Sequence, residues 1–420
     1  MIVKDIKIDF RRVFTPDGLI GIFLFLSTLL IGADLFGVDV LGFNVRIDQL
    51  FLAVLAVLLV LRGRFSFHEN IFMIAFLAFS LISTLFAFSK TRAVFYYVSI
   101  VYNAVFLFWS YASYVRYYGL MKFMRVFRAT CYTMFAIFII QYALVVLTGR
   151  EIPFMPSYGE FMGIPRFRLW FYEPSYMATY LSAWMAVSAY MWLIGEKKSY
   201  LADTVICVLM LALSTASTGY VAIAFVIVVV YVMWISKGLS VKKLIFPLVC
   251  LVLVGVFALA LPDVLGWFVG RLFNSSLDDA SGGRISQWAE TFGVFASNPF
   301  FGVGPGCYGL YLGLDAGHVP SNVTLDLMAT VGIFATIAFY GLTVWQIWKS
   351  VRIYLEDKNA HNMLLVAWAF GLLTFTLILQ ANQGYLRLYH WMILGIIEGG
   401  ILETRRFETG ERNTLVIKVR

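Results

Sequence analysis

The chain has 420 residues, of which 61% are hydrophobic and only 13% are charged. A water-soluble domain cannot bury that much apolar surface, so the composition excludes a soluble enzyme and predicts an all-α polytopic membrane protein. The net charge of +8 does not indicate a nucleic-acid partner, because the basic residues lie mostly in short loops that orient membrane spans. The four cysteines have neither metal-ligand spacing nor a disulfide pattern, and we expect no metal and no cofactor.

About twelve apolar runs are long enough to cross a membrane, since a span needs roughly 20 residues. In chain order they are 17–36, 47–62, 69–88, 93–115, 127–147, 174–194, 199–215, 219–236, 243–261, 322–347, 362–381 and 385–402. They follow one another with mostly short connections. We therefore expect a single integral membrane domain over residues 1–420.

The basic residues orient these spans. With the N-terminus in the cytoplasm, 23 of the 32 lysines and arginines fall in inner segments and the other nine in outer segments. Inner loops carry the excess of positive charge in membrane proteins. We therefore expect both termini in the cytoplasm, with 403–420 as a cytoplasmic tail, and two long outer loops at 149–173 and 262–321.

The two long outer loops hold most of the outer cations. Five of the nine outer basic residues lie in them: Arg150, Arg166, Arg168, Arg271 and Arg284. Loops of this length are usually functional, and cations on the unfavoured side suggest that an anion binds there. Contact with lipid phosphates is the alternative.

The first outer loop ends in an unusual run, RFRLWFYEPSY, from residue 166 to residue 176. Two arginines, Arg166 and Arg168, precede three aromatic residues, and Glu173 and Pro174 then open an apolar helix. A proline at the first helical position has no N–H to leave unpaired, and a carboxylate there meets the positive helix end. We expect a rigid cluster of cations and one carboxylate at the membrane surface.

The second outer loop contains a predicted amphipathic helix. Its apolar residues recur at helical spacing: Ile285, Trp288, Phe292 and Phe295. Arg284 and Trp288 are four residues apart and therefore share one face. A helix that lies flat on the membrane without any chemistry is the alternative for the apolar stripe.

A glycine run follows this helix at Gly302, Gly304 and Gly306. It predicts a tight loop in which the backbone closely approaches a neighbour. The run lacks the Lys-Ser/Thr pair and the preceding strand of a nucleotide-binding loop, so we do not expect a nucleotide here.

Several of these segments together resemble the O-antigen ligase and O-antigen polymerase family of bacterial envelope glycan enzymes. The resemblance lies in RLWFYEPSYMATY at 168–180, LSTASTGYVA at 213–222, GRISQWAETFGVFASNPFFGVGPG at 283–306 and SNVTLDLMATVGIFA at 321–335. Ligase-like members often have His-Asn where this chain has Ser321-Asn322, and the nearest histidine is His318. That difference favours the polymerase branch.

The resemblance implies a GT-C-like, metal-independent glycosyltransferase in the bacterial inner membrane. Its donor and acceptor would be polyprenyl-diphosphate-linked oligosaccharides, joined at the periplasmic face to build O-antigen or exopolysaccharide. A chain-length regulator protein and membrane lipids would be its partners. The alternative product is lipopolysaccharide, made by a ligase that transfers the glycan to the lipid A core.

The same resemblance suggests roles for particular side chains. The diphosphate would be bound by Arg166, Arg168 and Arg284, with Arg271 and Arg387 behind them. Glu173 is the expected base and His318 the second candidate, whereas an ion pair with Arg168 is the structural alternative for Glu173. Burial among Trp170, Phe171 and Tyr172 would raise the pKa of Glu173. Sugars or diphosphate would also contact Tyr172, Trp288 and Asn322, and Asp326, one helical turn beyond Asn322, is expected to face the cavity.

Twelve spans with both ends inside also describe many secondary transporters, including a flippase for lipid-linked glycans. Such transporters usually have two similar halves with binding residues near the middle of the membrane. Here one half alone carries the sixty-residue outer loop at 262–321, and the distinctive charges lie at the outer surface. The sequence therefore favours the enzyme.

Overall fold

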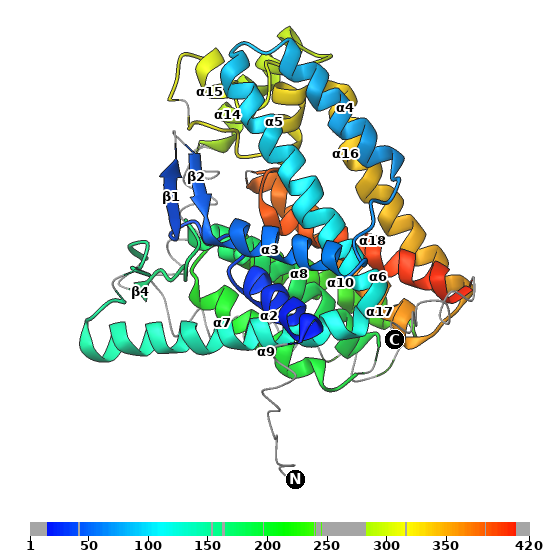
Figure 1. Ribbon diagram of the computed structural model, residues 1–420. Coiled ribbons are helices and arrows are strands. Elements are labelled where there is room, and N and C mark those ends of the chain that lie inside the picture. The colour runs from blue at the N-terminus through cyan, green and yellow to red at the C-terminus, as the bar shows by residue number, and fades with distance from the viewer. Residues whose placement is uncertain are drawn as a thin grey trace.

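The computed structural model describes residues 15–408, apart from 41–42, 153, 162–163, 196, 239, 241–244, 246–282, 316 and 383. This part of the chain is a bundle of α-helices with two short β-hairpins (Figure 1). The predicted all-α class is confirmed. Arg271, the tail beyond residue 408 and the part of the second outer loop before residue 283 lie outside the described residues.

The helices follow one another in the order of the predicted spans. The first half of the chain forms α2 (Pro16–Leu29), α3 (Ile47–Leu61), α4 (Ile71–Leu85), α5 (Lys90–Tyr102), the π-helical η1 (Asn103–Trp109), α6 (Ser110–Tyr118) and α7 (Leu120–Thr148). The second half forms α8 (Pro174–Leu193), α9 (Tyr200–Leu213), α10 (Ser217–Ser236), α14 (Arg284–Ser297), α15 (Tyr308–Tyr311), α16 (Val323–Glu356), α17 (Ala360–Ile378), the 3₁₀ turn η2 (Leu379–Ala381) and α18 (Leu388–Glu408). The antiparallel hairpins are β1 (Gly37–Val40) with β2 (Phe43–Arg46), and β3 (Glu160–Phe161) with β4 (Ile164–Pro165).

Five described helical segments are by themselves long and apolar enough to cross a membrane, and they indicate an integral membrane protein. They are Lys90–Tyr118, Leu120–Thr148, Ser217–Ser236, Val323–Glu356 and Ala360–Ala381. The apolar helices α2, α3, α4 and α9 have only 14 or 15 residues. At 1.5 Å per residue they are shorter than a hydrocarbon core of about 30 Å. The predicted span 243–261 lies outside the described residues except for Ile245, so twelve spans stay a prediction.

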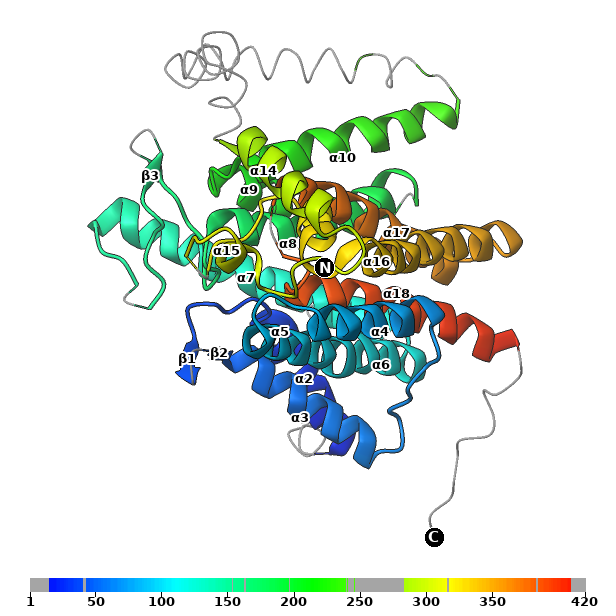
Figure 2. The same cartoon turned by 90° about the horizontal axis from the view of Figure 1, so that it is seen from above.

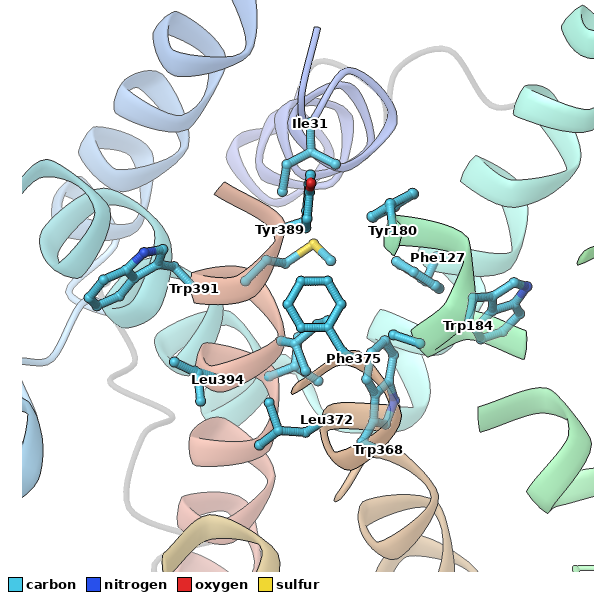
Figure 3. Close-up of a cluster of buried hydrophobic side chains, with 14 of the residues drawn as sticks. Ile31, Phe127, Tyr180, Trp184, Trp368, Leu372, Phe375, Tyr389, Trp391 and Leu394 are labelled. Atoms are coloured by element: carbon cyan, nitrogen blue, oxygen red, sulfur yellow. The ribbon is translucent and has the colours of Figure 1, made fainter. Parts of the chain in front are cut away.

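The centre of the bundle is α8, which is enclosed on nearly every side. Almost all of its residues are buried, including bulky Tyr180 and Trp184. The ring of Phe127 from α7 lies 4.8 Å from that of Trp184 and 5.2 Å from that of Trp368 on α17. Figure 3 shows this aromatic cluster between α7, α8, α17 and α18. A helix without a polar face has to be covered all round, which explains its central place.

Glycines let several of these helices approach closely. A Cβ atom at Gly395 would lie 2.5 Å from the Phe108 carbonyl oxygen, and one at Gly399 would lie 2.6 Å from the Ala112 carbonyl oxygen. These two glycines, four residues apart on α18, therefore allow the backbones of η1 and α6 to pack directly against it. Such small-residue contacts are how helices associate in lipid. From above, α10 lies at one edge of the resulting bundle and α2 and α3 at the opposite edge (Figure 2).

The segment that begins α16 is bent. Asn322 caps the helix, since its side-chain oxygen accepts hydrogen bonds from the backbone N–H groups of Thr324 and Leu325, both at 3.0 Å. Gly332 then interrupts the helix with φ +81°, and a Cβ atom there would lie only 2.1 Å from the carbonyl oxygen of Phe300. The short piece before the bend, which includes Asp326, is thereby turned toward the loop that follows α14.

Ion pairs at the two ends of the bundle join different sets of segments. Asp17, at the start of α2, pairs with Arg62 and Arg64 beyond α3 and accepts a hydrogen bond from Tyr118 at the end of α6. All three segments are expected on the inner side. This contact set agrees with helices that alternate in direction from α2 to α6.

At the other end, Asp34 beyond α2 contacts Arg46 before α3, Tyr172 before α8 and Arg387 before α18. All four residues fall in segments expected on the outer side. Because no contact in either set mixes inner and outer segments, the described loops sort as the alternating topology requires.

This topology predicts opposite labelling of two exposed positions. A single cysteine at position 290 should react with a membrane-impermeant maleimide in intact cells, whereas one at position 198 should react only after the inner face is opened. The expected orientation follows from the excess of basic residues on the inner side. Labelling of position 290 only after permeabilisation would reject it.

Candidate functional site

Two arginines of the first outer loop, Arg166 and Arg168, lie over one tyrosine. The backbone N–H of Tyr158 donates to the Arg166 carbonyl at 2.8 Å, which extends the β3–β4 pairing. The guanidinium carbons of Arg166 and Arg168 then lie 5.6 and 5.4 Å from the centre of the Tyr158 ring. Both distances are within cation–π range. The loop therefore holds two cations side by side at the outer end of the bundle.

Glu173 belongs to the same cluster. Its carboxylate accepts hydrogen bonds from the Ser175 hydroxyl at 2.9 Å and from the Tyr158 hydroxyl at 3.4 Å. Partial desolvation and the nearby carboxylate of Glu173 raise the pKa of Tyr158, so this hydroxyl stays protonated and donates. Within the described residues Glu173 forms no ion pair with Arg168, which instead donates to the carbonyl oxygen of Tyr172 at 2.6 Å. The ion pair with Arg168, which is the alternative role expected for Glu173, is therefore not found in the described part of the chain.

The three aromatics that precede Glu173 separate. Trp170 is 2% exposed and Phe171 is fully buried, whereas Tyr172 is 55% exposed. Phe171 packs into the core near Tyr180 and Tyr389. Of the three, only Tyr172 stays on the surface, where a sugar could contact its ring.

Arg387 forms the centre of a second charged group. One of its terminal nitrogens, Nη1, lies 3.2 Å from both carboxylate oxygens of Asp34, and its guanidinium carbon lies 3.7 Å above the Tyr176 ring. Arg46 binds the same carboxylate at 2.5 Å, and the backbone N–H of Tyr172 donates to it at 3.2 Å. From the sequence, Arg387 is expected only as a secondary binding residue after the loop arginines. Asp34 is given no role, because Tyr172 and Arg387, which it contacts, are remote from it in the chain.

The amphipathic helix α14 presents its apolar stripe outward. Thr291 and Val294 are its buried residues. Ile285 is 43% exposed and Phe292 is 54% exposed. Apolar side chains on an outward face agree with a helix that lies along the membrane surface. Arg284 and Trp288, both half-buried, lie between this face and the rest of the protein.

Gln287, which nothing in the sequence marked, ties α14 to the segment before α16. Its side-chain nitrogen lies 3.3 Å from the Nε2 atom of His318, and its side-chain oxygen accepts from the N–H and the hydroxyl of Ser321 at 3.1 and 2.5 Å. The His318 ring stacks on Tyr308, with 6.0 Å between centres. His318 is therefore held in a polar contact beside Tyr308.

The predicted close-approach glycine loop is confirmed. Gly302, Gly304 and Gly306 all have positive φ angles. A Cβ atom at Gly306 would lie 2.5 Å from the Tyr96 ring, and one at Gly304 would lie 2.2 Å from the Cβ atom of Ala87. These positions need glycine because the loop closes directly onto the end of α4 and the start of α5.

A cavity of about 170 Å³ opens where this loop meets α5, α16 and the start of α18. It is lined by Tyr96, Gly306, Tyr308, Val319, Asp326, Thr330, Gly384, Tyr385, Leu386 and Arg387. Asp326 faces it, as the sequence predicted. Among the arginines predicted to bind the diphosphate, Arg387 lines the cavity, and its guanidinium group also lies over the Tyr176 ring near the cluster around Glu173.

The other predicted residues lie around these two groups. Asn322 caps α16 and donates to the carbonyl oxygen of Gln380 at 2.9 Å, so its side chain is engaged in the fold. No three His, Cys, Asp or Glu side chains are grouped as metal ligands in the described ranges.

Comparison with known proteins agrees with the resemblance seen in the sequence. A family model described as O-Antigen ligase matches residues 204–340, about a third of the chain. The matched segment runs from α9 to the first half of α16 and contains Arg284, Trp288, His318, Asn322 and Asp326. No curated protein matches the chain. The match shows that this segment is similar to O-antigen ligases, and it does not separate ligase from polymerase activity.

Removal of the Asp34 carboxylate should destabilise the protein more than removal of an exposed one. Asp34, Arg46 and Arg387 are only 11 to 20% exposed. Asp34→Ala therefore removes the carboxylate that pairs with Arg387 and leaves Arg46 with Asp48, 3.5 Å away. We expect the free energy of unfolding to fall by an amount near the lower end of the roughly 3–5 kcal/mol that is typical when one partner of a buried ion pair is removed. Thermal unfolding in detergent measures it.

The matched control is Asp17→Ala, since the side chain of Asp17 is 44% exposed and also pairs with two arginines. An exposed pair contributes up to about 1 kcal/mol. Equal losses for the two variants would contradict the structural importance of Asp34.

Proposed function

We propose that this chain, which carries an O-antigen ligase family domain over residues 204–340, polymerises lipid-linked oligosaccharide repeat units at the periplasmic face of the inner membrane. The donor is an oligosaccharide on polyprenyl diphosphate, and the acceptor is a second lipid-linked repeat unit. One observation supports this most directly: cations from the first outer loop and from Arg387 lie at the same end of the bundle as a cavity with a carboxylate.

The proposed reaction needs charge stabilisation and one proton acceptor. The acceptor hydroxyl oxygen attacks the anomeric carbon of the donor, and its proton passes to the Glu173 carboxylate. The bond from the anomeric carbon to the phosphate oxygen breaks, and its electron pair leaves with the diphosphate. Arg166, Arg168, Arg284 and Arg387 stabilise that growing negative charge by charge-assisted hydrogen bonds, for which guanidinium groups are well shaped.

Polymerisation is favoured over ligation by the segment before α16. Where ligase-like members often have His-Asn, Ser321 is bound through its backbone and hydroxyl to Gln287, and Asn322 caps the helix. Neither side chain offers a base. Transfer to the lipid A core is the second candidate, because the family description itself is O-Antigen ligase. A chain-length regulator protein is the proposed partner of the polymerase.

Purified protein in liposomes with lipid-linked repeat units should produce longer lipid-linked glycans. Arg168→Ala and Arg284→Ala should each reduce elongation by about a hundredfold or more, the usual loss when one donor to the developing charge is removed. The lysine variants should recover activity only in part, since lysine keeps the charge but not the planar fork. Gel analysis of glycan length measures the result.

Arg352→Ala is the matched control, because the side chain of Arg352 is 54% exposed near the end of α16 and its ion pair in the described part of the chain is with Glu356, on the same helix. Transfer to lipid A core without elongation would identify a ligase. Translocation of the lipid-linked unit without a new glycosidic bond would identify a transporter. Full activity of both arginine-to-alanine variants would remove the proposed diphosphate site.

Glu173→Gln tests the proposed base. Glutamine still accepts the hydrogen bonds of Ser175 and Tyr158 but cannot take up the proton, so the maximal elongation rate should fall by about 10² to 10⁴. Elongation rate is measured against donor concentration at matched protein levels. Ser175→Ala removes one of the hydrogen bonds to Glu173 and controls for its orientation. A nearly normal maximal rate for Glu173→Gln would exclude this role and leave His318.

A further inference from the structure

We propose that the cavity lined by Asp326 and Arg387 binds the sugar that is joined directly to the donor diphosphate, and that this sugar is a neutral hexose with free hydroxyl groups. The inference rests on the proposed function, and it adds the chemical class of sugar that the donor carries at this position. Asp326 has the role of hydrogen-bond acceptor for the sugar hydroxyls.

Asp326 is a buried carboxylate without a partner in the described part of the chain. It is 5% exposed in the first turn of α16. Its backbone N–H donates to the Asn322 carbonyl and its own carbonyl accepts from the Thr330 hydroxyl, but its carboxylate makes no hydrogen bond or ion pair with any described residue. Burial of an unpaired carboxylate is costly. A ligand that brings hydrogen-bond donors into the cavity would offset this cost.

Two tyrosines form fixed walls of the cavity. The hydroxyl of Tyr96 accepts a hydrogen bond from Arg92 at 2.9 Å, and that of Tyr308 lies 3.0 Å from the Thr291 hydroxyl. With their hydroxyls held, the rings stay in place and offer apolar surface to a ligand. The hydroxyl of a third wall residue, Tyr385, is buried and has no partner among the described residues. The lining thus combines apolar ring surface with two unpaired polar groups, the Asp326 carboxyl group and the Tyr385 hydroxyl. A pyranose ring has matching chemistry, since its C–H groups form apolar faces and its hydroxyl groups form hydrogen bonds.

The position of Arg387 indicates which sugar of the oligosaccharide lies in the cavity. It is the arginine that both lines the cavity and takes part in the proposed diphosphate site. A sugar bonded directly to a phosphate oxygen must lie beside the cation that binds that phosphate. The cavity volume of about 170 Å³ is also below the roughly 300–1,000 Å³ of pockets for larger ligands. The space therefore suits one sugar ring, and the remainder of the oligosaccharide has to extend outward.

The chemistry of the lining predicts a selectivity. A carboxyl group accepts hydrogen bonds from hydroxyl groups and, when protonated, also donates one, so Asp326 suits the hydroxyl groups of a sugar. A uronic acid would bring a second carboxyl group into the same small space, and its charged form would lose its hydration there at a cost. A donor that carries a uronic acid next to the diphosphate should therefore bind less tightly than one that carries a neutral hexose.

Binding of two probes to the full-length protein in detergent tests the inference without any acceptor. The probes are a short prenyl diphosphate that carries glucose and the same molecule with glucuronic acid. The wild-type protein should bind the glucose probe more tightly. Asp326→Asn keeps one acceptor oxygen and replaces the other with an amide N–H₂ group, so it should weaken glucose binding severalfold, since one hydrogen bond contributes roughly 0.5–1.5 kcal/mol. The variant should also narrow the difference between the two probes.

Asp315→Asn is the matched control, because Asp315 is exposed in the neighbouring loop and lines no part of the cavity. The thermal midpoint of Asp326→Asn should equal or exceed that of the wild type, since an unpaired carboxyl group that is costly to bury in its charged form is replaced by a neutral amide. Tyr385→Phe, which deletes the other unpaired group, should weaken glucose binding by a smaller factor.

Unchanged probe affinities and unchanged preference in Asp326→Asn would overturn the inference. Unchanged binding with a large fall in the maximal elongation rate would also overturn it, and would assign proton transfer to Asp326. Failure of the proposed function gives a different pattern: the wild-type protein would bind the glucose probe with the expected preference but form no new glycosidic bond.

Discussion

The ion pair between Asp34 and Arg387 organises the outer end of this protein. Charge near hydrocarbon is costly unless it is satisfied by a partner, and here one carboxylate satisfies Arg387, Arg46 and the backbone N–H of Tyr172. Arg46 lies 12 residues from Asp34 in the chain, whereas Tyr172 and Arg387 lie 138 and 353 residues from it. Because Arg387 also lies over Tyr176 and lines the cavity, the same pair connects the segment before α8 to the cavity.

Close contacts at glycine make this arrangement possible. Lipid provides no hydrophobic force between helices, so association depends on how closely their backbones approach. Gly395 and Gly399 bring α18 against η1 and α6, and Gly332 bends α16 against the carbonyl of Phe300. The first contact positions the start of α18 and Arg387, and the second turns Asp326 toward the glycine loop. The packing and the proposed site therefore depend on the same small residues.

The described site has two parts with different chemistry. Around Tyr158, Arg166 and Arg168 lie with Glu173, and this is where the proposed diphosphate would bind. Beyond Arg387, the cavity is small and largely tyrosine-lined, with one unpaired carboxylate. A cationic cluster beside a small cavity suits the proposed donor, which has a strongly anionic diphosphate next to a neutral sugar. It also agrees with the family match, which covers the cavity loop and Asp326 but not the first outer loop.

Much of the candidate site could be predicted from neighbouring residues in the sequence. The run from Arg166 to Pro174 contains its own helix start and its own charges, and the glycine run from Gly302 to Gly306 is explained by local backbone geometry. Asp326 could be placed beside Asn322 by helical spacing alone. The role of Gln287 could not, since its partners His318 and Ser321 lie more than thirty residues away.

The sequence by itself determined the membrane class, the order of the apolar helices and the outer position expected for the long loops, because composition and charge asymmetry are sums over local segments. Only the tertiary structure decided which charges meet. Arg168 binds backbone carbonyls in place of Glu173, Arg387 pairs with Asp34, and Asp326 is left without a partner in the described chain. The physical reason is that an ion pair or a cavity depends on distances between atoms. Those distances are set by the packing of helices that are remote in the sequence.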